Sequence, residues 1–82
     1  MLQQIIEINE DETFLTADGF DDAVIGFSQG FNEPMRLIYS VKKCLNILGE
    51  SMNEDDALEY FEFNVSNSYV GDATPIWCWD II

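Results

Sequence analysis

Basic side chains are almost missing from this 82-residue chain, and histidine is absent altogether. Three Lys and Arg stand against 16 Asp and Glu, which gives a formal net charge of -13. The bases, Arg36, Lys42 and Lys43, fall in one short window, with eight acids before it and eight after it. A field of this sign repels nucleic acid and anionic membranes and attracts basic protein surfaces. We therefore expect a protein partner with a basic surface, and neither direct nucleic-acid binding nor membrane binding.

The missing histidine also weighs against catalysis, because histidine is the commonest acid–base group and metal ligand. The chain has no Gly-rich phosphate loop, and Cys44 lies on the apolar face of an expected helix with no histidine to activate it. Pairs of carboxylates are expected by chance among 16 acids. We predict that the chain is not an enzyme and uses no cofactor.

Cysteines and long apolar runs are scarce as well. Cys44 and Cys78 lie far apart, with no others to build a disulfide framework. No stretch approaches the roughly 18 apolar residues of a membrane span. The first residues lack the basic region of a signal peptide and reach an acid at Glu7. A cytoplasmic protein with reduced thiols is the expectation.

Apolar and aromatic side chains, in contrast, are plentiful. The chain is 48% hydrophobic and 13% aromatic, too apolar for an acidic disordered tail. Its length suits one small core, so we predict a single domain over residues 1–82.

The hydrophobic pattern indicates an α+β fold. Residues 2–8 and 13–16 read as an N-terminal hairpin around a polar turn, residues 23–27 and 35–39 as two central strands, and residues 76–82 as a C-terminal strand. Gly26 suggests a bulge or a close approach of another backbone in the first central strand. Two helices precede that last strand, one capped by Ser40 and ending at Gly49, the other capped by Asn53. Their apolar stripes are Val41, Cys44, Leu45 and Leu48, and Ala57, Leu58, Phe61 and Val65. We predict a mostly antiparallel sheet with both helices packed on one face.

Three stretches resemble a family of short, uncharacterised proteins of tailed phages and prophages. They are Asp-Gly-Phe-Asp-Asp-Ala at residues 18–23, Glu-Tyr-Phe-Glu-Phe-Asn-Val at 59–65, and Tyr-Val-Gly at 69–71 followed by Thr-Pro at 74–75. The resemblance covers roughly residues 17–79 and implies a phage-type protein of the host cytoplasm, with no functional residues to transfer. The chain departs from the family in being more acidic and in having a shorter turn between the helices.

An acidic stripe beside an aromatic ring is the sharpest candidate site. Asp55, Glu59 and Glu62 share the side of the second helix, and Phe63 lies about 180° from its apolar stripe. Phe63 is either an anchor for a basic partner or packs on a loop. Trp77 and Trp79 share one face of the last strand, where the N-terminal hairpin covers them or they form an exposed partner-binding surface.

A second cluster, Asp18, Asp21 and Asp22, has the ligand type that Ca²⁺ or Mg²⁺ prefers. It lacks the alternating acids and spaced glutamate of a calcium loop, so a glycine turn with solvated carboxylates is the competing interpretation.

Two hypotheses follow. In the first, a small acidic phage-type protein binds a basic surface of a host or phage protein, for example by mimicking nucleic acid and inhibiting a nucleic-acid-handling enzyme. In the second, an accessory domain is acidic only for solubility and holds a metal or small ligand in the loops at residues 18–22 and 69–75.

Overall fold

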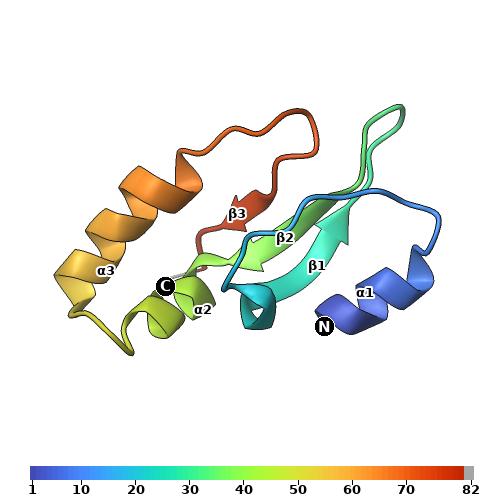
Figure 1. Cartoon of the computed structure of the whole chain (residues 1–82). Coiled ribbons are helices and arrows are strands. Elements are labelled where there is room, and N and C mark those ends of the chain that lie inside the picture. Colours follow the sequence, from blue (N-terminus) through green and yellow to red (C-terminus); the bar gives the residue numbers. More distant parts are fainter. Residues whose placement is uncertain (81–82) are drawn as a thin grey trace.

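The computed structural model describes residues 1–80, which form three helices and a three-stranded sheet (Figure 1). The elements are α1 (Leu2–Ile8), η1 (Asp21–Ala23), β1 (Val24–Ser28), β2 (Arg36–Ser40), α2 (Val41–Leu48), α3 (Glu54–Phe61), η2 (Glu62–Ser66) and β3 (Ile76–Cys78). Here η1 is a short 3-10 turn and η2 a π-helical turn that continues α3. The predicted α+β class is confirmed.

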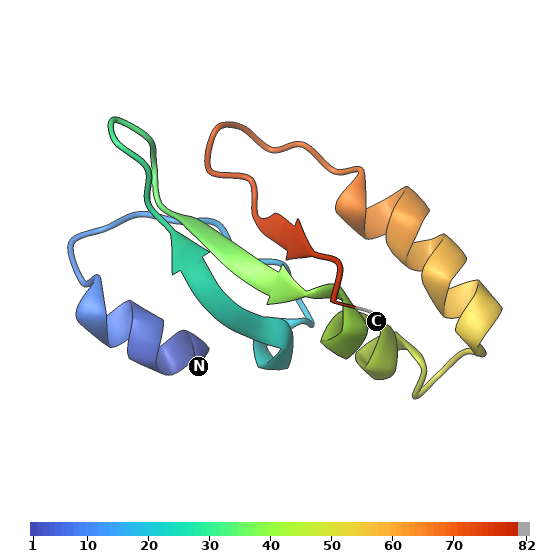
Figure 2. The same ribbon diagram turned by 180° about the vertical axis from the view of Figure 1, so that it is seen from behind.

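The sheet is mixed rather than mostly antiparallel. Its strand order is β1-β2-β3, in which β1 is antiparallel to β2 and β3 is parallel to β2. Because α2 and α3 separate β2 from β3, the chain crosses over and returns in the same direction, as a parallel pair requires. In both ribbon views α1 lies beside β1 and α3 lies beside β3 (Figures 1 and 2).

The predicted N-terminal hairpin is wrong. Residues 2–8 form α1, and residues 13–16 join no strand. Only Ile5 of this helix is buried, whereas Ile6 and Ile8 are exposed, and the Asn9 side-chain amide donates to the Ile5 carbonyl over 3.0 Å at the helix end. Leu, Gln and Glu favour a helix, and a single buried position fits a helix as well as a strand, so short apolar runs of this kind are ambiguous.

The central strands agree with the sequence. The register between β1 and β2 shifts between Val24 and Gly26, at the position where Gly26 suggested an irregular strand. One face of the sheet carries the core, to which Ile5 of α1 and Phe61 of α3 both contribute. The other buried members of this core are Phe20, Ala23, Val24, Met35, Leu37, Tyr39, Val41 and Cys44.

Tyr39 binds the irregular segment around Ala17 to this core. Its ring is fully buried, and its hydroxyl accepts a hydrogen bond from the Ala17 backbone N–H at 2.7 Å. Burial raises the pKa of Tyr39, so the group remains a neutral phenol at physiological pH. The bond satisfies a backbone donor of a segment that has no strand partner.

Two side chains cap the N-terminus of α2. Ser40, the predicted cap, accepts from the Lys43 backbone N–H at 3.1 Å. Asp80 adds a second cap, since its carboxylate accepts from the Ser40 hydroxyl at 2.6 Å and from the Lys42 N–H at 3.0 Å. A carboxylate at this helix N-terminus interacts favourably with the helix dipole, whereas the positive charges of Lys42 and Lys43 interact unfavourably with it. The sequence pattern did not indicate Asp80 for this role.

Asp80 is expected to make stability depend on pH in the acid range. The hydrogen bonds from Ser40 and Lys42 lower the pKa of Asp80 below its ordinary value of 3.8. Its contribution is therefore full above that ordinary value and is lost as the pH falls through the lowered folded-state pKa. We expect the difference in free energy of unfolding between the native chain and Asp80→Asn, measured by urea titration, to be constant near neutrality and to shrink below about pH 4. A difference that does not change down to about pH 2 contradicts the cap.

Within residues 1–80, no helix is long and apolar enough to cross a bilayer.

Candidate functional site

The outer surface of α3 and η2 carries the exposed acids Asp55, Glu59 and Glu62 and the Phe63 ring that were predicted there. Asn53 caps the helix as predicted, its side-chain oxygen accepting from the Asp56 N–H at 2.8 Å. Ala57 and Phe61 are buried against the core, which turns Glu59, Tyr60, Glu62 and Phe63 outward. Asp55, Glu59 and Glu62 are all exposed, as the acidic stripe requires.

Phe63 is the most exposed aromatic ring of this surface. It is 70% accessible, and Tyr60 is 45% accessible. This degree of exposure is incompatible with Phe63 packing on a loop. Phe63 belongs to η2, and π-helical turns of this kind often occur at functional sites. A role for Phe63 as an anchor stays a prediction.

A shallow hollow of about 430 Å³ lies among these side chains and is lined by Asp56, Glu59, Tyr60, Phe63 and Asn64. We call it the Phe63 hollow. It combines two carboxylates with two aromatic rings and no base. Carboxylates pair with a Lys or Arg head group, while ring faces contact its aliphatic stem and attract its charge. The hollow is therefore suited to a basic side chain.

The sequence identified only part of this hollow. Glu59 and Phe63 line it, whereas Asp55 lines a different groove, between α2 and α3. Asp56 and Tyr60 were missed as site residues. Asp56 was interpreted only as a first-turn carboxylate that complements the helix dipole. Positions 56, 59, 60 and 63 nevertheless follow the helical spacing of a single face.

Trp77 and Trp79 pack against α3, not against an N-terminal hairpin, and α3 covers them only in part. The Phe61 ring meets both edge-on, with centroids 5.3 Å from Trp77 and 5.7 Å from Trp79. Trp77 also lies 5.1 Å from Tyr39. Trp79 stays 45% exposed. Because Phe61 points inward and Phe63 outward, the two indoles lie on the inner side of α3, away from the Phe63 hollow.

The Trp77 indole N–H is buried and finds no acceptor among the described residues. Trp77 lines a second hollow, of about 280 Å³, together with Asp18, Val70 and Pro75. The structure thus brings together the loops at residues 18–22 and 69–75, which the sequence linked only by hypothesis.

The aspartates of the first loop do not assemble into a metal site. Asp18 belongs to the turn at Gly19, whose φ is +88°, and Asp21 and Asp22 lie in η1. All three side chains are exposed. In the part of the chain that the structure describes, no group of three or more His, Cys, Asp or Glu side chains is placed to hold a metal ion. The geometry gives the metal hypothesis no support.

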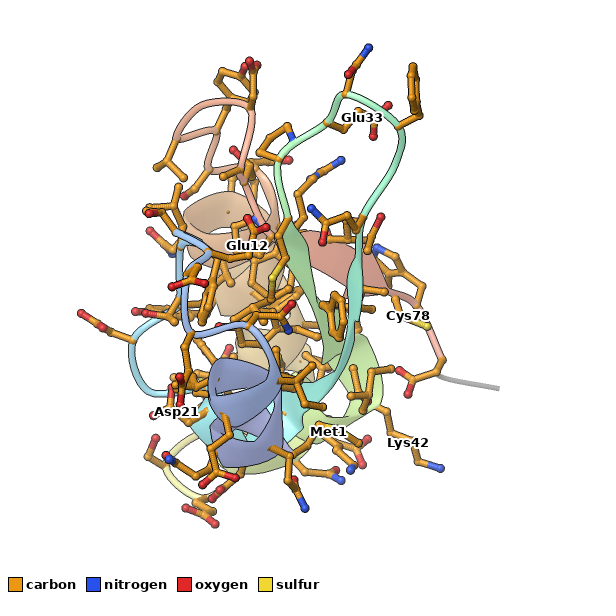
Figure 3. The ribbon with its side chains drawn as sticks, turned by 90° about the vertical axis from the view of Figure 1, so that its right-hand side faces the viewer. Met1, Glu12, Asp21, Glu33, Lys42 and Cys78 are labelled. Carbon is orange, nitrogen blue, oxygen red and sulfur yellow. The ribbon has the colours of Figure 1, made fainter. Side chains whose placement is uncertain are left out.

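The two cysteines lie in different environments, Cys44 in α2 and Cys78 in β3. Cys44 is fully buried in the core, and burial raises its pKa to about 12, so it is a protonated thiol at neutral pH. Cys78 is half-buried and points, like Lys42, away from α1 (Figure 3). Both thiols are free, as expected.

Comparison of the chain with protein-family models, with curated proteins and with solved structures finds no match. The functional argument therefore depends on the residues of this chain, and the resemblance to phage proteins stays a prediction.

Proposed function

We propose that this protein is a binding module that docks the outer surface of α3 onto a basic surface of another protein. One observation carries the proposal. Phe63 is 70% exposed within a hollow that holds Asp56 and Glu59 but no base. Exposing an aromatic ring to water has a free-energy cost that binding removes, and rings of this kind are common anchors of protein interfaces.

The overall charge supports the same kind of partner. A net charge of -13 raises the encounter rate with a cationic surface and disfavours an anionic one. Nucleic-acid-handling enzymes present such cationic clefts. In that case Asp55, Glu59 and Glu62, which are all exposed, take the places of phosphates, and the protein is a competitive inhibitor in the cytoplasm of a phage-infected host.

Paired variants of equal charge test the proposal. Glu59→Gln/Glu62→Gln alters the proposed surface, whereas Glu10→Gln/Glu12→Gln makes the same two-unit change at exposed positions of the turn after α1. Proteins captured from lysate by the native chain are identified and purified, and their dissociation constants are measured at about 50 and 200 mM salt. We expect Glu59→Gln/Glu62→Gln to weaken binding about tenfold more than the control pair, and Phe63→Ala to weaken it about fivefold to tenfold.

The accessory-domain hypothesis gives a different result. If acidity serves only solubility, the two charge pairs behave alike and Phe63→Ala has no effect. That pattern, or binding that ignores salt, refutes docking through α3.

A further inference from the structure

A groove of about 810 Å³ separates α2 from α3. Its floor is apolar, formed by Leu45, Met52, Ala57 and Leu58. Three exposed acids, Glu50, Glu54 and Asp55, line its rim, with Lys42 as the one base among the lining residues. We call this feature the α2–α3 groove. It lies on another side of α3 from the Phe63 hollow, with which it shares no lining residue.

Apart from Met52, which lies between the two helices, the groove floor consists of side chains that helical periodicity assigns to a core. Leu45 continues the apolar stripe of α2, and Leu58 continues that of α3. The structure buries their neighbours Cys44 and Ala57 but leaves Leu58 37% exposed and Leu45 half-buried. The two apolar stripes are therefore wider than the core that covers them. An apolar strip left open between two helices is the kind of surface that receives a third helix.

The shape and charge of the groove define its occupant. Each flanking helix has eight residues, which is a length of about 12 Å, so the floor can contact two to three turns of a helix. Such a helix needs apolar residues at i, i+3, i+4 and i+7 to reach the floor. Lys or Arg on its flanks then pair with the carboxylates of the rim.

We infer that the α2–α3 groove binds a basic amphipathic helix of a partner protein. This goes beyond the proposed function, because the groove recognises a secondary structure as well as a charge and shares only Asp55 with the acidic stripe, and no residue with the Phe63 hollow. Binding at the groove does not require Phe63, and binding at the Phe63 hollow does not require Leu58, so either proposal can fail without the other.

A synthetic peptide of about 14 residues serves as the probe, with Leu on one helical face and Lys on the rest. A scrambled peptide of identical composition keeps the charge and removes the apolar face. The three methionines supply internal reporters when their methyl groups are ¹³C-labelled: Met52 in the groove, Met35 fully buried and Met1 exposed at the start of α1. We expect the amphipathic peptide to shift the Met52 signal and to bind about tenfold more tightly than the scrambled one, with Met35 unchanged.

Leu58→Gln removes apolar floor without changing charge, and Val70→Gln is its control, since Val70 is 61% exposed and does not line the groove. We expect Leu58→Gln to weaken peptide binding about tenfold, and Val70→Gln and Phe63→Ala to leave it within about twofold. The Met35 signal verifies that each variant is folded. Equal affinity for both peptides, an unmoved Met52 signal, or full binding by folded Leu58→Gln overturns the inference.

Discussion

Replacing Phe61 with alanine is expected to lower the free energy of unfolding by about 3–5 kcal/mol. Phe61 is fully buried, and its ring is in edge-on contact with Trp77 and Trp79. The substitution opens a cavity between α3 and β3 and removes both aromatic contacts. A domain of this length is stabilised by only about 4–12 kcal/mol in total, so the loss is expected to remove about a quarter or more of its stability.

Urea denaturation followed by tryptophan fluorescence measures this effect directly, because the two Trp residues of the chain are the ones that contact Phe61. Phe63→Ala is the matched control: it makes the same chemical change two positions along, at a side chain that is 70% exposed. The control is expected to change stability by less than about 0.5 kcal/mol. A loss below about 1 kcal/mol for Phe61→Ala contradicts the packing of α3 on β3.

The second large effect is expected at Ser40, where alanine should reduce the free energy of unfolding by about 2 kcal/mol, the upper end of the range for a helix cap. The Ser40 hydroxyl is buried and has two roles, since it accepts from the Lys43 N–H and donates to the Asp80 carboxylate. Alanine therefore removes one cap and loosens the other. Ser51→Ala is the control, because that hydroxyl is exposed and only donates to the Leu48 carbonyl at 3.4 Å.

Chemical denaturation of the Ser40→Ala and Asp80→Asn single variants and of their combination completes a double-mutant cycle. We expect the combined loss to be clearly smaller than the sum of the single losses, because the two side chains share one hydrogen bond. Strict additivity indicates that Ser40 and Asp80 act independently at the start of α2.

Local signals predicted the central part of the fold. The caps Ser40 and Asn53 placed the starts of α2 and α3, because a cap depends on backbone groups only a few positions away. Gly26 marked the register shift inside β1. The direction of β3 could not be derived in this way. An alternating strand suits a parallel and an antiparallel partner equally well, and the choice depends on a crossover of 35 residues between β2 and β3.

The candidate site likewise combines features that local sequence signals predict with features that depend on distant parts of the chain. Helical geometry alone predicted that Phe63 points outward. The same geometry assigned Leu58 to the core, because periodicity gives the direction of a side chain but not whether another element covers it. Of the two alternatives for Trp77 and Trp79, cover by the N-terminal hairpin is wrong, because residues 2–8 form a helix. Phe61 packs against both rings instead, and Trp79 stays 45% exposed. The second cap, Asp80, is 40 residues from Ser40 and has no local signal.

The distance between Ser40 and Asp80 in the chain has a consequence for biosynthesis. At about 5–20 residues per second, β2 and α2 leave the ribosome seconds before the segment that contains β3 and Asp80. That segment supplies the second strand neighbour of β2 and the second N-terminal cap of α2. During that interval the edge of β2 that later pairs with β3 is unpaired, and Tyr39 lacks its contact with the Trp77 ring. The native arrangement of β2 and α2 is therefore expected to be completed only after Asp80 has emerged.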